Sequence, residues 1–162
     1  MRKTDHIPSK ICSREELKQW AAQIRAYGRT IGFTNGIFDI LHRGHIASLS
    51  QAAANTDYLV VGINSDASTK RLKGESRPVN DEQSRALLMA SLLMVDKVVI
   101  FEEDTPLELI TSFMPDVLTK GGDYTVEQVA GAKEVIANGG KVVINPIVTG
   151  FSTTSTIEKL GL

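Results

Sequence analysis

The sequence predicts a doubly wound α/β protein built on a five-stranded parallel sheet. Short apolar runs alternate with helical segments along the chain. Each run is apolar throughout, which is typical of strands covered on both faces. Glycine and proline stand at the ends of these segments, so residues 1–162 are expected to form a single domain. Right-handed crossovers then place helices on both faces of the sheet.

The first helix has clear signals at both ends. Residues 1–12 lack periodicity and are expected to form a flexible tail. Ser13 and Glu16 form a capping box, in which each side chain bonds the other residue's backbone N–H. Apolar residues at helical spacing then predict a helix to about Tyr27, with Gly28 ending it.

The remaining elements alternate regularly. Strands are expected over residues 30–34, 58–63, 97–101, 116–119 and 141–145. Helices are expected over residues 44–55, over 81–93, from Thr105, over 126–138 with a break near Gly131, and from Ser152. Thr105 is expected as the N-cap of its helix and Pro106 as the first helical residue, where the missing N–H of proline costs nothing.

Composition excludes several classes of protein. The 18 Lys and Arg residues against 19 Asp and Glu give a net charge of -1, so no basic excess attracts nucleic acid. Cys12 is the only cysteine, which excludes an intrachain disulfide. No apolar run approaches the roughly 20 residues of a membrane span. We expect a soluble cytoplasmic protein, and, because the first helix can pack on a partner subunit, a homo-oligomer (dimer or higher).

The loop after the first strand carries the clearest chemical signal. Ligands of doubly wound folds bind beyond the carboxyl ends of the strands. Here His42 and His45 frame Arg43-Gly44 where a helix should begin. A helix N-terminus presents unpaired N–H groups, and imidazoles three residues apart face the same side, so this loop predicts a phosphate site. A zinc site would need further ligands that the sequence does not supply. The glycine motifs of P-loop and dinucleotide-binding proteins are absent.

These residues resemble a known family. His42-Arg43-Gly44-His45 resembles the His-x-Gly-His motif of the nucleotidylyltransferase superfamily. Further segments occur in the same order in D-glycero-β-D-manno-heptose 1-phosphate adenylyltransferases: residues 34–42, 64–74, 76–80, 120–124 and 152–154. The resemblance spans about Ser13 to Leu160. It implies a Rossmann-like nucleotidylyltransferase fold with strand order 3-2-1-4-5, in the stand-alone form that depends on a separate sugar kinase.

The resemblance also implies the reaction. An oxygen of heptose 1-phosphate attacks the α-phosphorus of ATP, ADP-heptose forms and pyrophosphate leaves, with Mg²⁺ assisting. The product supplies heptose for the lipopolysaccharide inner core. A phosphate monoester is already an anionic nucleophile, so catalysis reduces to positioning and charge stabilisation. His42 and His45 would donate hydrogen bonds to the phosphates, and Lys73 and then Lys70 would clamp the triphosphate.

The other candidate residues follow the remaining strands. Residues expected to bind the nucleotide are Thr34, Asn35, Gly36, Phe38, Gly44, Gly121, Asp123, Ser152, Thr153 and Thr154. Residues expected to bind the acceptor are Asp39, Asp66, Arg77 and Arg85. Asp39 or Asp123 could contact Mg²⁺, which would be held mainly by the ATP phosphates.

Simpler interpretations of these candidates stay open. The basic run 70–73 can be a solvated surface, and Gly121-Gly122-Asp123 can be a plain turn. Asp66 can cap its segment, and Arg85 can pair with Asp81 one helical turn away.

Two other functions compete with the adenylyltransferase. One is a cytidylyltransferase acting on glycerol 3-phosphate or a related phosphoalcohol. Ile157 argues against it, because relatives elsewhere in the superfamily carry a basic residue near this place. The other is a catalytically silent nucleotide-binding module, which the presence of both histidines with Lys70 and Lys73 disfavours.

Overall fold

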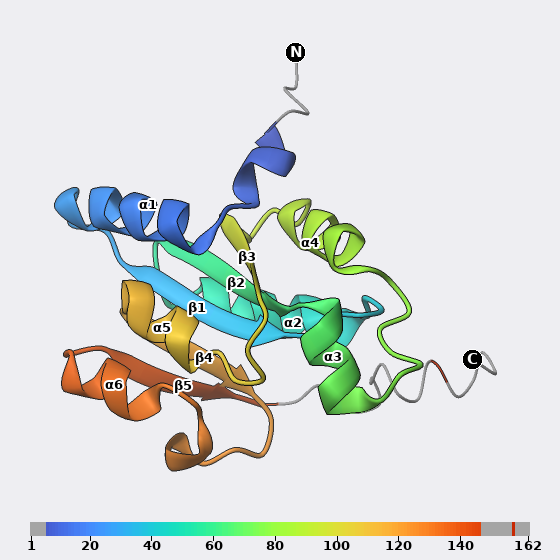
Figure 1. Ribbon diagram of the computed structural model, residues 1–162. Helices are drawn as coiled ribbons and strands as arrows, with labels where there is room; N and C mark the ends of the chain where they lie inside the picture. The colour runs from blue at the N-terminus through green and yellow to red at the C-terminus, as the bar shows by residue number, and fades with distance from the viewer. Residues whose placement is uncertain (1–5, 147–156, 158–162) are drawn as a thin grey trace.

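The computed structural model describes residues 6–146 and residue 157, and its centre is one parallel sheet (Figure 1). The strands are β1 (Ile31–Gly36), β2 (Tyr58–Asn64), β3 (Lys97–Phe101), β4 (Val117–Gly121) and β5 (Lys141–Asn145). Their order across the sheet is β3-β2-β1-β4-β5, and all four pairings are parallel. The predicted fold and strand order are therefore confirmed. The helix expected from Ser152 lies outside the described residues.

Helices lie on both faces of the sheet (Figure 1). The α-helices are α1 (Arg14–Ala26), α2 (Arg43–Ala53), α3 (Asp66–Lys73), α4 (Glu82–Ala90), α5 (Leu107–Phe113) and α6 (Ala132–Ala137). Two short 3₁₀ helices are η2 (Pro8–Lys10) and η3 (Val126–Gln128). No helix of the described ranges is both long and apolar enough to cross a membrane.

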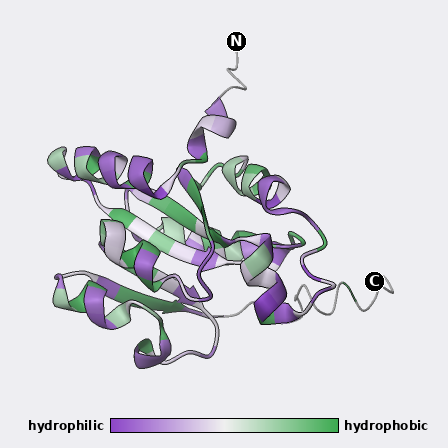
Figure 2. Ribbon diagram, in the orientation of Figure 1, coloured by the Kyte–Doolittle hydropathy of each residue, from purple (hydrophilic) through white to green (hydrophobic). Residues whose placement is uncertain are grey.

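Each face of the sheet has its own apolar core. The first core joins α1, α5 and α6 to the sheet through buried residues that include Leu17, Phe33, Val60, Ile110 and Leu118. The second joins α2 and α4 to the opposite face through buried residues that include Leu49, Leu59, Val61, Ile63 and Met89. Figure 2 shows the central strands largely apolar between helices with polar outer faces. Burial on both faces explains why the strands read as continuous apolar runs.

Helix α3 is the main element that the sequence pattern does not predict, because no helix is expected between the strand over residues 58–63 and the helix over residues 81–93. Its sequence, DASTKRLK, has no apolar stripe, and Figure 2 shows it as largely hydrophilic. A local signal starts it instead: the Ser65 side chain accepts a hydrogen bond from the Ser68 backbone N–H. Asn64 then fixes the helix to β2, since its Nδ2 donates to Ser68 Oγ at 3.1 Å.

Some of the predicted helix ends are confirmed and one is wrong. The capping box of Ser13 and Glu16 is confirmed. The prediction for α5 was wrong by one position, because Pro106 itself is the N-cap and Thr105 lies outside the helix. The expected break near Gly131 is confirmed: this residue has φ +84° and separates η3 from α6.

The expected tail is structured in its second half. Residues 8–10 form η2, and Ile11 bridges to Val98 at the edge of the sheet. Lys10 fixes this segment, since its Nζ donates to the carbonyl oxygens of Leu92 at 3.3 Å and Val95 at 2.7 Å. The prediction of a flexible tail up to residue 12 was therefore wrong for this part.

Candidate functional site

Three neighbouring strands end in polar residues on one face of the sheet. Phe33 of β1, Val60 of β2 and Leu118 of β4 all belong to the first core. Because side chains alternate between faces along a strand, Asn35, Asn64 and Lys120 project from the same face at the carboxyl ends. Lys120 Nζ lies 3.4 Å from Asn35 Oδ1. This edge matches the expected location of a ligand site in a doubly wound sheet.

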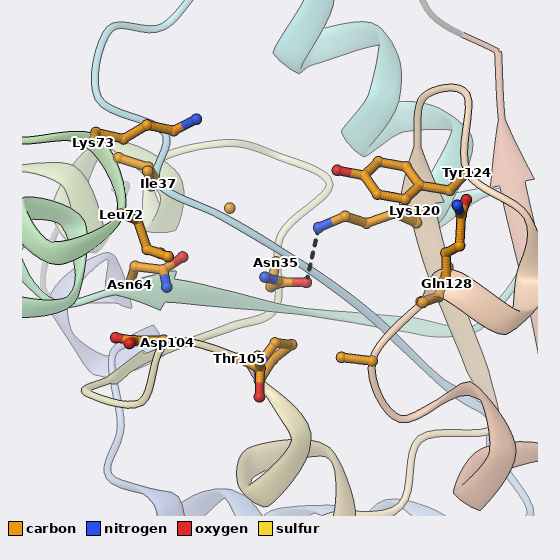
Figure 3. Close-up of a pocket in the computed structure, with 14 residues that line it drawn as sticks. Asn35, Ile37, Asn64, Leu72, Lys73, Asp104, Thr105, Lys120, Tyr124 and Gln128 are labelled. Carbon is orange, nitrogen blue, oxygen red and sulfur yellow. Dashed lines mark hydrogen bonds between the residues drawn. The ribbon is translucent and has the colours of Figure 1, made fainter.

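A pocket of about 360 Å³ opens over these strand ends (Figure 3). Its lining residues are Asn35, Gly36, Ile37, Asn64, Leu72, Lys73, Asp104, Thr105, Pro106, Lys120, Tyr124, Gln128, Val129 and Ala130. Figure 3 shows Lys73 on one side of the pocket and Lys120 with Tyr124 on the other. Two ammonium groups surrounded by amides, a carboxylate and a phenol suit a phosphorylated ligand that also carries hydroxyl groups.

Lys120 is a pocket residue to which the sequence pattern assigns no role, as are Asn64, Asp104 and Gln128. Burial lowers the pKa of its ammonium group, which indicates a partly desolvated charge at the pocket wall. The charge lies 5.7 Å from the centre of the Tyr124 ring, within range of a cation–π contact. Its place directly after the apolar residues of β4 is the sequence signal that points to it, because ligands bind beyond the carboxyl ends of the strands.

The two histidines begin helix α2. His42 is the N-cap, in extended conformation and without a side-chain capping bond, and His45 lies in the first turn. Their rings are stacked, with centroids 3.8 Å apart and planes 20° apart. The Nδ1 atoms of both are buried and have no hydrogen-bond partner in the described part of the chain. Buried polar atoms normally have partners, so the pair has unused hydrogen-bonding capacity beside a helix N-terminus.

Both histidines are neutral at physiological pH. Burial lowers the pKa of His42. Burial, together with the neighbouring His42, lowers the pKa of His45 to about 4. A neutral imidazole still donates one hydrogen bond, and an approaching phosphate would favour its protonation. The pair can therefore stabilise negative charge that increases during a reaction.

The loop between β1 and α2 joins the pocket to the histidines. Gly36 and Ile37 form part of the pocket wall. The next residue, Phe38, places its ring edge-on to His45, with centroids 5.2 Å apart. A Cβ atom at Gly36 would lie 3.0 Å from the Phe38 ring, so the close packing of this loop favours glycine there.

Asp39 and Arg77 face each other inside the protein. Asp39 is 1% exposed, and its carboxylate accepts from Arg77 Nε at 2.7 Å and from the backbone N–H groups of Val79 and Asn80 at 2.9 Å. Burial opposes ionisation, but the N–H groups of Asn80 and Val79 and the Arg77 guanidinium outweigh it and lower the pKa of Asp39. These contacts occupy Asp39, so this arrangement does not present it to an acceptor or a metal ion.

Arg85 and Asp66 form a second internal pair. Arg85 is 0% exposed, and its Nη2 donates to Asp66 Oδ1 at 2.7 Å. The ion pair joins α4 to the first residue of α3. Arg85 therefore has no surface to offer an acceptor, and the acidic residue that it pairs with is Asp66 rather than Asp81, the alternative one helical turn away.

The remaining candidates are distributed around the pocket. Lys73 lines it, whereas Lys70 is exposed on α3 outside the lining. Thr34 is 5% exposed and projects from the face of β1 opposite to Asn35. Gly121 ends β4 where a Cβ atom would lie 3.2 Å from Ser48 Oγ of α2, so this glycine lets the helix approach the strand closely.

Two other candidates, Gly44 and Asp123, lie outside the pocket lining. Gly44 is the second residue of α2, and Asp123 is exposed beside Tyr124. Ser152, Thr153 and Thr154 lie outside the described residues. Within residues 6–146 and 157, no three His, Cys, Asp or Glu side chains gather in a way that could hold a metal ion.

Comparison with known proteins identifies the family. The model of the family described as cytidylyltransferase-like matches residues 33–158. The chain is 56% identical over 152 residues to the bifunctional protein HldE of Rhodospirillum rubrum, covering 94% of this chain and 31% of that protein. It is 53% identical over 150 residues to HldE of Klebsiella pneumoniae, covering 93% of this chain and 31% of that protein. The chain thus spans about a third of the length of these relatives.

Solved structures agree with this placement. A lipopolysaccharide core biosynthesis protein from Thermoplasma volcanium superposes with a TM-score of 0.60 at 32% identity, covering 75% of this chain and 98% of that one. A pantoate-beta-alanine ligase from Francisella tularensis superposes with a TM-score of 0.57 at 17% identity, covering 90% of this chain and 74% of that one, and so shares the fold alone. With its parallel sheet, its stacked histidines at the start of α2 and the family match over most of its length, the chain belongs to the cytidylyltransferase-like family.

Proposed function

We propose that the chain is an adenylyltransferase. It transfers AMP from ATP to D-glycero-β-D-manno-heptose 1-phosphate and yields ADP-heptose and pyrophosphate for the inner core of lipopolysaccharide. The loop motifs that resemble heptose 1-phosphate adenylyltransferases support this assignment. So do the extensive identity to the HldE proteins and the likeness to a lipopolysaccharide core biosynthesis protein. The proposal concerns only the third of HldE that this chain spans.

One observation carries the proposal, namely the pocket with two lysines beside the histidine loop. Lys73 and Lys120 offer positive charge for phosphates, Lys73 for the triphosphate as the sequence predicts and Lys120 for the phosphate of the acceptor. Asn64, Asp104 and Gln128 offer hydrogen-bonding groups for sugar hydroxyls. This mixture supports a phosphorylated acceptor that carries hydroxyl groups, because a partly desolvated charge needs an anionic partner.

The histidine pair would contact the nucleotide. His42 and His45 would donate hydrogen bonds to oxygens on the α-phosphate and to the oxygen that bridges to the leaving group. The N–H groups at the start of α2 would add to this positive potential. The described part of the nucleotide site would then lie at the end of β1 and β4, near Gly36 and Gly121. The predicted roles of Ser152, Thr153 and Thr154 remain part of this proposal.

The chemical step needs no general base. An oxygen of the sugar phosphate already carries negative charge and attacks the α-phosphorus in line. A new P–O bond forms, the bond to the bridging oxygen breaks, and the electron pair leaves with pyrophosphate. Charge increases on the bridging and α-phosphate oxygens, where neutral imidazoles and backbone dipoles stabilise it most effectively in a partly dry site. Positioning the two phosphates next to each other supplies much of the remaining rate enhancement.

Magnesium is proposed to bind together with the nucleotide, through the ATP phosphates. The described residues do not fit a site held by protein ligands alone, because Asp39 is fully occupied by internal hydrogen bonds and no cluster of three ligating side chains is present among them. Mg²⁺ prefers phosphate oxygens and water with few protein ligands. Removal of Mg²⁺ should therefore abolish turnover and leave the melting temperature of the protein without nucleotide unchanged.

The test is pyrophosphate release with a panel of substrate pairs. ATP and CTP are each combined with the β-anomer of heptose 1-phosphate, its α-anomer, mannose 1-phosphate and glycerol 3-phosphate. Release with ATP and the β-heptose phosphate alone supports the proposal. Preference for CTP with glycerol 3-phosphate would replace it by a cytidylyltransferase. Nucleotide binding without release from any pair would indicate a silent binding module.

A further inference from the structure

Phe38 has an unusual backbone conformation. Its φ is +50°, and the only other described residue outside glycine with a positive φ is Met114. Met114 is the C-cap of α5, a position where left-handed residues are common. Phe38 lies between β1 and α2 and has no such local reason. A bulky side chain persists in this region only where the surrounding structure holds it there.

The residues on both sides of Phe38 are anchored. The carbonyl oxygen of Ile37 accepts a hydrogen bond from Arg85 Nη1 at 2.6 Å. On the other side, the carboxylate of Asp39 accepts from the backbone N–H groups of Val79 and Asn80. Asn80 also donates through Nδ2 to the Asp39 carbonyl oxygen at 2.7 Å. The backbone is thus fixed immediately before and immediately after the left-handed residue.

Arg85 connects these two anchors. Its Nε donates to the carbonyl oxygen of Asn80 at 3.0 Å, while Nη1 binds Ile37 and Nη2 binds Asp66. All three nitrogens of a wholly buried guanidinium are therefore used. Each partner belongs to a different segment. Burying an arginine side chain costs free energy unless its N–H groups are hydrogen-bonded. The three hydrogen bonds of Arg85 therefore fix the relative positions of its partners.

The side chain of Phe38 carries this geometry to the histidines. Phe38 is 8% exposed, and its ring meets the His45 ring edge-on, with an angle of 67° between planes. His45 in turn stacks on His42. If Phe38 moved to an ordinary backbone conformation, its ring would leave His45, which would lose one of the two ring contacts that orient it.

We propose that Arg85 and Asp39 are positioning residues that hold Phe38 in the left-handed conformation and so orient His45. This inference rests on the proposed function, in which His45 contacts the nucleotide phosphates. It replaces the expectation that the two residues bind the acceptor. Neither side chain reaches a ligand, and both act through the backbone of one loop.

The experiment compares Arg85→Lys and Asp39→Asn with a matched control, Arg29→Lys. Lysine keeps the charge of Arg85 but cannot reach three partners, and asparagine keeps the shape of Asp39 but loses acceptor capacity. Arg29 is ion-paired with Asp57 and precedes β1, so it lies at the amino-terminal end of the strand, whereas the histidine loop lies beyond the carboxyl end. Folding is followed by thermal unfolding, and pyrophosphate release gives kcat and KM.

A second readout does not depend on activity. The chain has three histidines, at positions 6, 42 and 45, so the imidazole NMR signals are few. The ring of Phe38 shifts the signals of His45, and Phe38→Leu identifies that contribution. In Arg85→Lys and Asp39→Asn, the His45 signals should move toward those of Phe38→Leu. In Arg29→Lys they should stay at the wild-type position.

The kinetic expectation is a selective loss of kcat. Each folded variant should lose roughly tenfold to a hundredfold in kcat, with KM for the substrates changed less than threefold, because misplacing a catalytic group by about 1 Å has effects of this size. The double variant should lose less than the product of the single losses, since both residues act on one loop. Wild-type His45 signals together with wild-type kcat in a folded Arg85→Lys or Asp39→Asn protein would overturn the proposal.

The outcomes separate this inference from the proposed function. If the wild-type protein released no pyrophosphate from any pair, the proposed function would fail, and the NMR comparison would still decide whether Arg85 and Asp39 position His45. If Arg85→Lys failed to fold, Asp39→Asn would carry the test alone. Losses of activity that matched the unfolded fraction, without movement of the His45 signals, would assign both residues a purely structural role.

Discussion

The imidazole rings of His42 and His45 stack with their centroids 3.8 Å apart, at the first turn of α2. Two protonated rings at this distance would repel each other, and burial already keeps both neutral. The pair is therefore arranged to acquire positive character only when an anion arrives. A phosphate undergoing substitution is such an anion, because negative charge moves onto its α-phosphate and bridging oxygens as the bond to the leaving group breaks.

Removing either histidine should reduce turnover far more than binding. His42→Asn and His45→Asn are each expected to lower kcat by roughly 100-fold to 1000-fold, the usual effect of losing one donor to a developing charge. Pyrophosphate release at saturating ATP measures this. His6→Asn is the matched control, because His6 is exposed near the start of the described chain. Near-normal turnover in a folded His45→Asn protein would refute the assigned role.

The stability of the protein should fall in mild acid because of His45. Its pKa in the folded state is about 4, whereas an unfolded histidine has a pKa of about 6.5. Between these values the unfolded state binds more protons, so lowering the pH through this window favours unfolding. Thermal unfolding of wild type and His45→Gln from pH 7.5 to 4.5 should show a steeper decline for wild type. Parallel curves would contradict this pKa difference.

Lys120 should determine affinity for the acceptor. Lys120→Met keeps the apolar stem along the pocket wall and removes the charge. We expect the KM for the sugar phosphate to rise by about tenfold or more, because a charge-assisted contact in a partly dry pocket contributes roughly 1.5–3 kcal/mol. Lys18→Met, on the exposed surface of α1, serves as the control. An unchanged KM for the acceptor together with a raised KM for ATP would assign the pocket to the nucleotide.

The sheet could be predicted from the sequence because a strand that is buried on both faces needs apolar residues at every position, and so appears as a continuous apolar run. Helix α3 could not, because its residues, DASTKRLK, are mostly polar and show no apolar periodicity, and only the cap at Ser65 marks its start. The histidine loop could be identified from its position along the chain. It follows a parallel strand and precedes a helix, and such a loop lies at the carboxyl ends of the strands, where ligands bind.

Polar residues were harder to interpret for a physical reason. Charged residues are typical of a substrate site, and the sequence offers four candidates: Asp39, Asp66, Arg77 and Arg85. A sequence does not reveal whether such a charge faces a ligand or another charge of the protein. In the fold, Arg85 is completely buried and its guanidinium holds backbone carbonyls. Lys120 is hard to identify for the opposite reason. In the sequence, a lysine at a strand end resembles an ordinary surface residue, and only the fold brings Asn35 of a neighbouring strand beside it.

Gly131, the residue before α6, should tolerate substitution poorly. Its φ is +84°, and a Cβ atom there would lie 2.8 Å from Cδ1 and 2.9 Å from Cγ2 of Ile110, which is fully buried. Gly131→Ala therefore combines a left-handed alanine with overpacking of the first core, and should lower the free energy of unfolding by about 2–4 kcal/mol. Gly28 provides the matched control, since its φ is +70° and nothing lies within 4 Å of its Cβ position. Gly28→Ala should cost only about 1 kcal/mol, the backbone contribution alone. Urea unfolding of the two variants measures the difference, and equal losses would show that Ile110 moves aside without cost.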